Sequence, residues 1–216
     1  MLRHVFTMEY LRSLGYVVMA MLIAVSVHEF AHGLVSHKFG DPTPKREGRL
    51  TLNPLKHLDL WGTICMIVFR VGWAKPVRIN TSYYKNKKLG IIAVSLAGPL
   101  TNYIVAFISL LLYYFFAVKG ISIGVWFYYV AVLNVGLGTF NLMPIPPLDG
   151  SNVLMELCPG VIPFYRKIGK YARIFLAVGL AAGVLSRPMN FVNDVVLDSM
   201  WELICKMFWK EKVIML

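Results

Sequence analysis

The feature that most constrains this chain is an uncharged apolar run that leads directly into ionisable side chains. Residues 14–27 read LGYVVMAMLIAVSV, and His28-Glu29-Phe30-Ala31-His32 follows at once. On an α-helix, positions i and i+4 share a face, so His28 and His32 can present two imidazoles to one metal ion. Glu29 lies one position on from His28, where its carboxylate can act as a general base toward water at the metal.

The apolar run and the motif together are long enough to cross a membrane. Residues 14–35 form the first predicted span, and at about 1.5 Å per residue His28 lies roughly 21 Å along it. That depth is past the middle of a hydrocarbon core about 30 Å thick. Ionisable side chains inside a span are costly and therefore functional by default. The alternative, an accidental Glu29 on a plain helix, would leave a carboxylate without a partner.

The composition is that of a membrane protein. Hydrophobic residues make up 57% of the chain and charged residues 15%, with a mean hydropathy of +0.62. The net charge of +11 is better explained by basic loops beside membrane spans than by nucleic acid, because the sequence has no aromatic-plus-basic nucleic-acid module. The expected partner is therefore the lipid bilayer. The three scattered cysteines fit neither a disulfide framework nor a C-x-x-C zinc site.

We expect an α-helical polytopic membrane protein that forms a single membrane-embedded domain over residues 1–216, with about four to five membrane segments. Residues 195–209 place Asp198, Glu202 and Lys206 four apart with apolar residues between them, which favours an interfacial amphipathic helix over a span. The predicted spans are residues 14–35, 89–118, 125–143 and the shorter 171–185.

A short polar-to-apolar region separates the first two strong spans. Residues 60–71 (LWGTICMIVFRV) are apolar but too short to cross, which favours a small cytoplasmic-side β or re-entrant element. Residues 72–80 (GWAKPVRIN) follow, and Pro76 restricts them to an edge strand. Such an edge could hold an extended substrate by β-addition. A plain polar connector explains residues 72–80 equally well.

The distribution of Lys and Arg predicts the orientation. Residues 37–58, 70–88 and 150–173 hold five, six and four of them, against Arg3, Arg12, Lys119 and Arg187 on the other side. Basic loops mark the cytoplasmic face. We therefore expect a multi-pass protein of the cell membrane whose first and third spans run inward, with the metal site opening toward the cytoplasm.

A catalytic zinc ion usually has three protein ligands and one water, so one ligand remains to be found. A metzincin would need a third histidine where this chain has Lys38. Asp149 is the stronger candidate, because it follows an apolar span and a proline-rich break, and a carboxylate at that depth needs a cation. The alternatives are that Asp149 caps the next helix, or that Glu47, in a charged loop, is the ligand instead.

Several separate blocks, in order, make the chain resemble the site-2 protease family of intramembrane zinc metalloproteases, in its compact prokaryotic form without a PDZ domain. The resemblance covers about residues 14–155. One departure is Leu60, where the family often has proline. The blocks are HEFAHG, GD-x-T-x-K-R-x-GRLTLNPLKH-x-D at residues 40–59, GWAKPV at 72–77, AGPLTN at 97–102 and NLMPIPPLDG at 141–150.

The resemblance implies one Zn²⁺ per chain, bound by His28, His32 and Asp149, with Glu29 as the catalytic base and Asn141 holding substrate. It also implies hydrolysis of peptide bonds within or near the transmembrane segments of substrate proteins. Two other classes stay open: a prenyl-peptide type of membrane metallohydrolase, and a catalytically silent zinc-binding scaffold. No pattern in the sequence predicts an oligomeric state.

Overall fold

The computed structural model describes residues 7–59 and 75–212. Every secondary-structure element assigned in these ranges is a helix. The long helices are α1 (Met8–Lys38), α4 (Lys87–Val118), α5 (Gly124–Leu142), α6 (Asp149–Leu157), α7 (Ile162–Ala181) and α8 (Ser186–Lys212). The short ones are α2 (Thr43–Arg46), η2 (Pro54–Lys56), η3 (Thr81–Tyr83) and η4 (Pro159–Val161).

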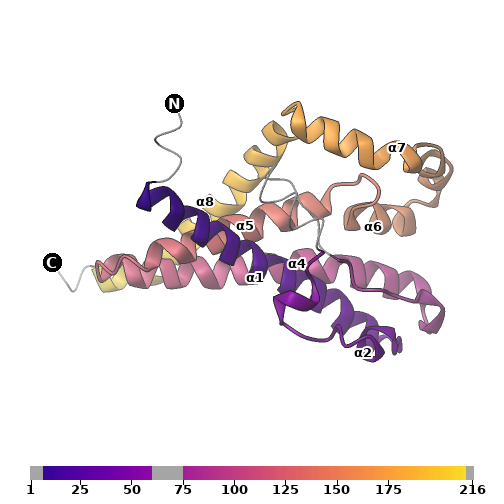
Figure 1. The fold of residues 1–216 in the computed structure, drawn as a ribbon, viewed down its shortest axis with the longest axis horizontal. Helices are drawn as coiled ribbons and strands as arrows, with labels where there is room; N and C mark the ends of the chain where they lie inside the picture. The colour runs from indigo at the N-terminus through magenta and orange to yellow at the C-terminus, as the bar shows by residue number, and fades with distance from the viewer. Residues whose placement is uncertain (1–6, 60–74, 213–216) are drawn as a thin grey trace.

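Helices α1, α4 and α5 form the body of the molecule and pack side by side (Figure 1). Each of the three is long and apolar enough to cross a membrane, which supports the expected multi-pass architecture. The predicted fourth or fifth span is not confirmed in the described residues. The apolar part of α7 is only Tyr171–Leu180, whereas a spanning helix needs about 20 residues.

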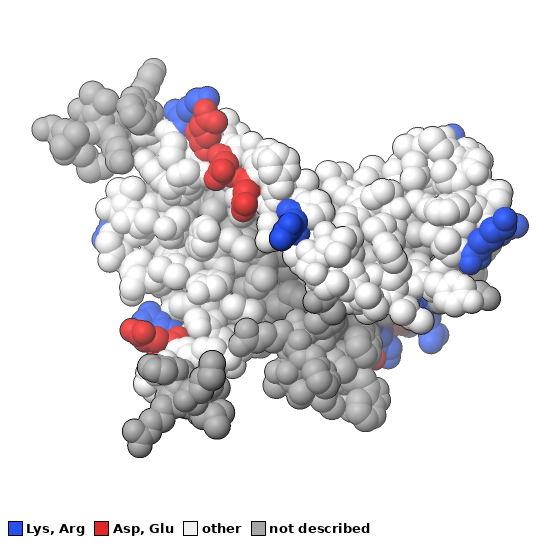
Figure 2. Space-filling view, turned by 90° about the horizontal axis from the view of Figure 1, so that it is seen from above, with Lys and Arg blue, Asp and Glu red and all other residues white. Residues whose placement is uncertain are grey.

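The outer surface of α4 carries a continuous apolar stripe. The side chains of this stripe are spaced three to four residues apart, which puts them on one helical face, and all are exposed. An exposed apolar stripe of this length fits contact with lipid. The face shown in Figure 2 is likewise mostly uncharged. The stripe consists of Leu100, Ile104, Ile108, Leu112 and Phe115.

Small side chains let α8 approach α4 and α5 closely. Ile204 of α8 is fully buried against Ala106 and Ala131. The predicted polar stripe lies on the opposite face, where Lys206 Nζ and Glu202 Oε1 are 2.6 Å apart. The helix predicted at residues 195–209 is thus part of α8. Its core-facing residue Ile204 packs against α4 and α5.

The predicted β or re-entrant element at residues 60–71 lies outside the described residues. Residues 75–80, the described part of the predicted edge segment, run without helix or strand. Two of their backbone N–H groups donate to acidic side chains. Val77 N–H donates to Glu29 Oε2 at 2.8 Å, and Asn80 N–H donates to Asp41 Oδ2 at 2.8 Å. The segment therefore lies against the end of α1 that carries the metal motif.

Asp41 organises the chain where it leaves α1. Its buried carboxylate accepts hydrogen bonds from Ser36 Oγ, Thr43 N–H and Asn80 N–H at 2.8–2.9 Å. The hydroxyl groups of Ser36 and Tyr84 are also hydrogen-bonded, at 2.8 Å. Burial alone would raise the pKa of Asp41, but the donated hydrogen bonds outweigh burial and hold this pKa below its usual value.

We expect Asp41→Asn to destabilise the protein by about 1–3 kcal/mol, because an amide nitrogen cannot accept a hydrogen bond and leaves a buried donor unpaired. The melting temperature in detergent measures this loss. Since the pKa of Asp41 is lowered on folding, its stabilisation is complete above a pH of about 4 and disappears as the pH falls further. Asp198→Asn, at an exposed site on α8, is the matched control. Equal melting temperatures for the two variants would contradict the role given to Asp41.

Candidate metal centre

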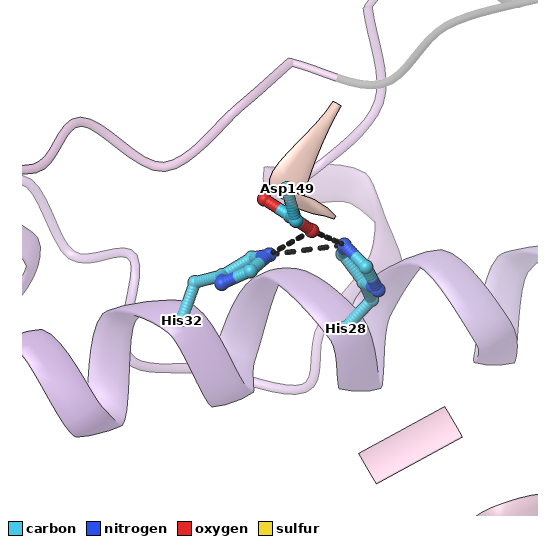
Figure 3. A group of neighbouring side chains, drawn as sticks. All are labelled: His28, His32 and Asp149. Carbon is cyan, nitrogen blue, oxygen red and sulfur yellow. Dashed lines mark hydrogen bonds and ion pairs between the residues drawn. The ribbon is translucent and has the colours of Figure 1, made fainter. Parts of the chain in front are cut away.

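Three side chains that the sequence singled out meet at one point. His28 and His32 lie one turn apart on α1, and Asp149 is the first residue of α6 (Figure 3). The two Nε2 atoms are 3.0 Å apart, and Asp149 Oδ2 lies 3.3 Å from that of His28 and 3.2 Å from that of His32. Asp149 therefore faces the histidines and does not cap α6 with its side chain.

The three donor atoms fit a zinc ion. Tetrahedral zinc with bonds of about 2.0–2.1 Å spaces its ligand atoms roughly 3.3 Å apart. The observed separations of 3.0, 3.2 and 3.3 Å are close to that spacing. Asp149 Oδ2 is moreover buried and accepts no hydrogen bond from the described residues. A buried carboxylate oxygen without a donor is costly, and a cation at this point would remove the cost.

Hydrogen bonds fix the tautomer of both rings. His32 Nδ1–H donates to the carbonyl oxygen of Val94 at 2.7 Å, and His28 Nδ1–H donates to Asn102 Oδ1 at 2.6 Å. In a neutral ring with Nδ1 protonated, Nε2 carries the lone pair. Both lone pairs therefore point toward Asp149, as two metal ligands require.

The acceptor for His28 is itself held by a chain of buried amides. Asn134 Nδ2 donates to Val130 O at 2.8 Å, which turns Asn134 Oδ1 toward Asn102. Asn102 Nδ2 then donates to Asn134 Oδ1 at 2.8 Å and to Ala24 O at 3.0 Å. These contacts leave only Asn102 Oδ1 to face His28. Both asparagines are fully buried, so no water competes for these bonds.

Two glycines allow the helices to approach the centre. A Cβ atom on Gly98 of α4 would lie 2.6 Å from both His28 Cε1 and His32 Nε2. A Cβ atom on Gly150 would collide with the carbonyl oxygen of Leu142, the last residue of α5. Gly98 thus leaves room for the ligands, and Gly150 lets α6 begin directly against the end of α5.

Glu29 lies beside the three metal-site residues and does not belong to their group. Its Oε2 atom accepts the Val77 N–H, and its Oε1 atom accepts no hydrogen bond from the described residues. Glu47 is placed elsewhere: its carboxylate pairs with the exposed guanidinium of Arg78 at 3.4 Å. The structure therefore gives no support to Glu47 as the third ligand.

Asn141 lies near the end of α5, and no hydrogen bond joins it to the three metal-site residues in the described structure. Its Nδ2 donates to Leu137 O on the same helix at 3.0 Å. Its expected part in holding substrate stays a prediction.

The sequence assigned no role to four residues that shape the site, although two of them, Gly98 and Asn102, belong to the AGPLTN block: Val94, Gly98, Asn102 and Asn134. One signal was available for two of them, because Asn102 and Asn134 are strongly polar side chains inside predicted spans. A buried amide in an apolar bundle must find a partner. That argument alone would have marked both as functional or structural, without saying which side chain they support.

The family model for peptidase family M50 matches residues 16–123 and 117–185. The chain belongs to peptidase family M50. This confirms the resemblance to site-2 proteases, and Zn²⁺ is the cofactor of such metalloproteases. Together with the apolar helices, membership of M50 makes the protein a membrane zinc metalloprotease.

Curated relatives agree with this assignment to M50. YwhC of Bacillus subtilis, named as a candidate zinc metalloprotease, is 42% identical over 152 residues, which are 67% of this chain and 69% of YwhC. Rip2 of Mycolicibacterium smegmatis, also named as a candidate zinc metalloprotease, is 32% identical over 155 residues, 64% of this chain and 55% of Rip2. The zinc metalloprotease MJ0392 of Methanocaldococcus jannaschii is 29% identical over 147 residues, 67% of this chain and 35% of MJ0392. No solved structure matches.

We expect Asn102→Ala to weaken zinc binding even though the variant still contains His28, His32 and Asp149. Without the Asn102 acceptor, His28 can rotate or adopt the other tautomer, and loss of such a supporting hydrogen bond typically costs about 10–100-fold in metal affinity. Competition with a chelator on the purified protein measures the dissociation constant.

Two further variants bracket this result. Asp149→Ala should remove zinc from the protein, and Asn190→Ala, an exposed amide on α8, should leave the affinity unchanged. Wild-type affinity in Asn102→Ala would show that the buried amides do not support the metal centre.

Proposed function

We propose that the protein hydrolyses peptide bonds within or near the transmembrane segments of membrane-protein substrates, with Glu29 as the catalytic base. The observation that carries this proposal is the place of the metal group. His28 and His32 belong to α1, a candidate membrane span, and they share it with Glu29. Membership of the M50 metalloproteases supports a hydrolytic role for this group.

His28, His32 and Asp149 are the proposed zinc ligands, through the two Nε2 atoms and Oδ2. Three protein ligands leave a position open for chemistry. When bound, zinc supplies Lewis acidity that polarises the scissile carbonyl and makes the attacking water more acidic.

Glu29 takes the proton of the attacking water and returns it to the leaving amine. The Val77 N–H engages Glu29 Oε2 at 2.8 Å and so restrains the carboxylate. The other oxygen, Oε1, accepts no hydrogen bond from the described residues and would be the one to take the proton. Asn141 would contribute by turning its amide from Leu137 toward the substrate, where an N–H donor can stabilise developing negative charge.

We further propose that the site opens toward the cytoplasmic face of the cell membrane. The basic residues of the segments 37–58, 70–88 and 150–173 support this orientation. The metal motif near the end of α1 and Asp149 at the start of α6 then lie toward that face. Water reaches the peptide bond from the same side.

A helical substrate must unwind locally, because its peptide groups are engaged in its own hydrogen bonds. Residues 75–80 are the proposed partner for the unwound chain, by β-addition. The N–H of Val77 is already donated to Glu29, so pairing falls to the neighbouring residues. In the described structure, the backbone groups of Arg78 and Ile79 make no hydrogen bond.

Glu29→Gln tests the base directly. The variant should keep its zinc and its fold but lose cleavage of a membrane-embedded substrate, by at least the upper part of the roughly 10²–10⁴-fold typical of general acid–base catalysis. The measurements are metal content and the rate of product formation. Wild-type cleavage by zinc-loaded Glu29→Gln would refute the mechanism. If wild type cleaves no membrane peptide, yet Glu29→Gln fully rescues a deletion defect, the protein is a zinc-binding scaffold instead.

Proline substitutions separate two roles of residues 75–80. Ile79→Pro removes a free backbone donor and should lower cleavage by raising the KM, if substrate pairs with this segment. Val77→Pro removes the donor to Glu29 and should lower kcat instead. Ile79→Ala, which keeps the backbone N–H, is the control for loss of the side chain. Full activity of Ile79→Pro, with zinc bound, would rule out β-addition at Ile79.

A further inference from the structure

A cavity of about 380 Å³ lies beside the candidate metal centre. Three parts of the chain that are distant in sequence form its walls: the end of the extended segment before η3, the first turns of α4, and α6 with the start of α7. Its size is within the range of small-ligand pockets, about 300–1,000 Å³. Its lining includes Ile79, Val94, Asn152, Met155, Glu156 and Ile162.

The cavity shares residues with the site itself. Val94, whose carbonyl oxygen accepts the His32 Nδ1–H, lines it. Asn152, one turn after Asp149 on α6, also lines it. Ile79, from the segment proposed to pair with substrate, lines the cavity as well. A substrate chain held at Ile79 would therefore lie next to this cavity.

The walls are largely apolar, and one carboxylate lies among them. Of the described lining residues, Glu156 alone is acidic, and it is half-buried. No hydrogen bond or ion pair engages it within the described chain. Met155 and Ile162 supply apolar surface next to it. A cavity of this kind suits a side chain with an aliphatic stem and a cationic end, which is a description of lysine or arginine.

Charge complementarity points to the source of that side chain. Membrane segments carry Lys and Arg mainly at their cytoplasmic ends. None of the described lining residues is basic, so Glu156 is the one charged side chain among them and can attract a cation from a ligand. We propose that the cavity binds a lysine or arginine flanking the cytoplasmic end of the substrate's membrane segment, with Glu156 pairing its charge. This inference rests on the proposed function and gives it a specificity determinant.

Peptide binding tests the proposal without requiring turnover. The receptor is the zinc-loaded Glu29→Gln protein in lipid nanodiscs, with or without Glu156→Gln as a second change. The probes are two fluorescent single-span peptides that differ only in a Lys or a Gln at the cytoplasmic end. Glu156→Gln should weaken binding of the Lys peptide about three- to tenfold and leave the Gln peptide unaffected.

A charge exchange sharpens the test. Glu156→Lys should bind a peptide with Glu at the same position more tightly than it binds the Lys peptide, reversing the wild-type order. Glu202→Gln, on α8 and outside the cavity, is the control and should preserve that order. Zinc content and melting temperature of each variant show that it is folded.

The outcomes distinguish this inference from the proposed function. Equal weakening of both peptides overturns charge recognition by Glu156, and so does unchanged binding of both. Cleavage by Glu29-containing protein is measured in parallel on the same peptides. Cleavage without any dependence on Glu156 refutes only the inference, whereas no cleavage and no binding of either peptide refutes the proposed function as well.

Discussion

The hydrogen bond from His28 Nδ1–H to Asn102 Oδ1 is the contact on which the site depends. A chain of hydrogen bonds determines which end of the Asn102 amide faces His28: Val130 O orients Asn134, and Asn134 in turn orients Asn102. The same helix α4 supports the second histidine through Val94 O. Residues 94 and 102 are about two turns apart, so one placement of α4 sets both rings. A shift of α4 by a single turn would break both supports together. Helix packing thus determines which nitrogen of each ring faces the metal.

Gly98 makes this placement of α4 possible. It lies between the two supporting positions, at the level of the histidine rings, and leaves the space that a side chain would take from the ligands. Pro99 follows it and has no N–H, so the helix gives up one hydrogen bond at this level. In a bundle surrounded by lipid, such a defect is tolerated where it faces protein, and Pro99 is buried. The local cost in α4 therefore coincides with the point where the helix must approach the metal centre most closely.

The sequence was sufficient to predict that His28, His32 and Asp149 meet, but not which residues support them. His28 and His32 follow from helical periodicity, and Asp149 follows from a carboxylate at the end of an apolar span. The partners of Asn102 could not be predicted, because they depend on the rotation and register of three helices. The contact of Val77 with Glu29 was equally out of reach, since it joins residues 48 apart through a backbone group. The expected span at residues 171–185 is not confirmed, because the apolar part of α7 covers only Tyr171–Leu180.

The anchoring of residues 75–80 connects the base to the path of the substrate. Val77 is held by Glu29 and Asn80 by Asp41, and between these two points the backbone groups of Arg78 and Ile79 have no hydrogen-bond partner among the described residues. A free stretch between two anchors keeps an extended shape at small entropic cost. Under the proposed function, a substrate strand pairing with it would lie between the carboxylate of Glu29 and the cavity at Glu156. Because Val77 restrains Glu29, any displacement of this segment by the substrate would also move the base. Binding of the unwound substrate chain and positioning of the Glu29 carboxylate would then be coupled through residues 75–80.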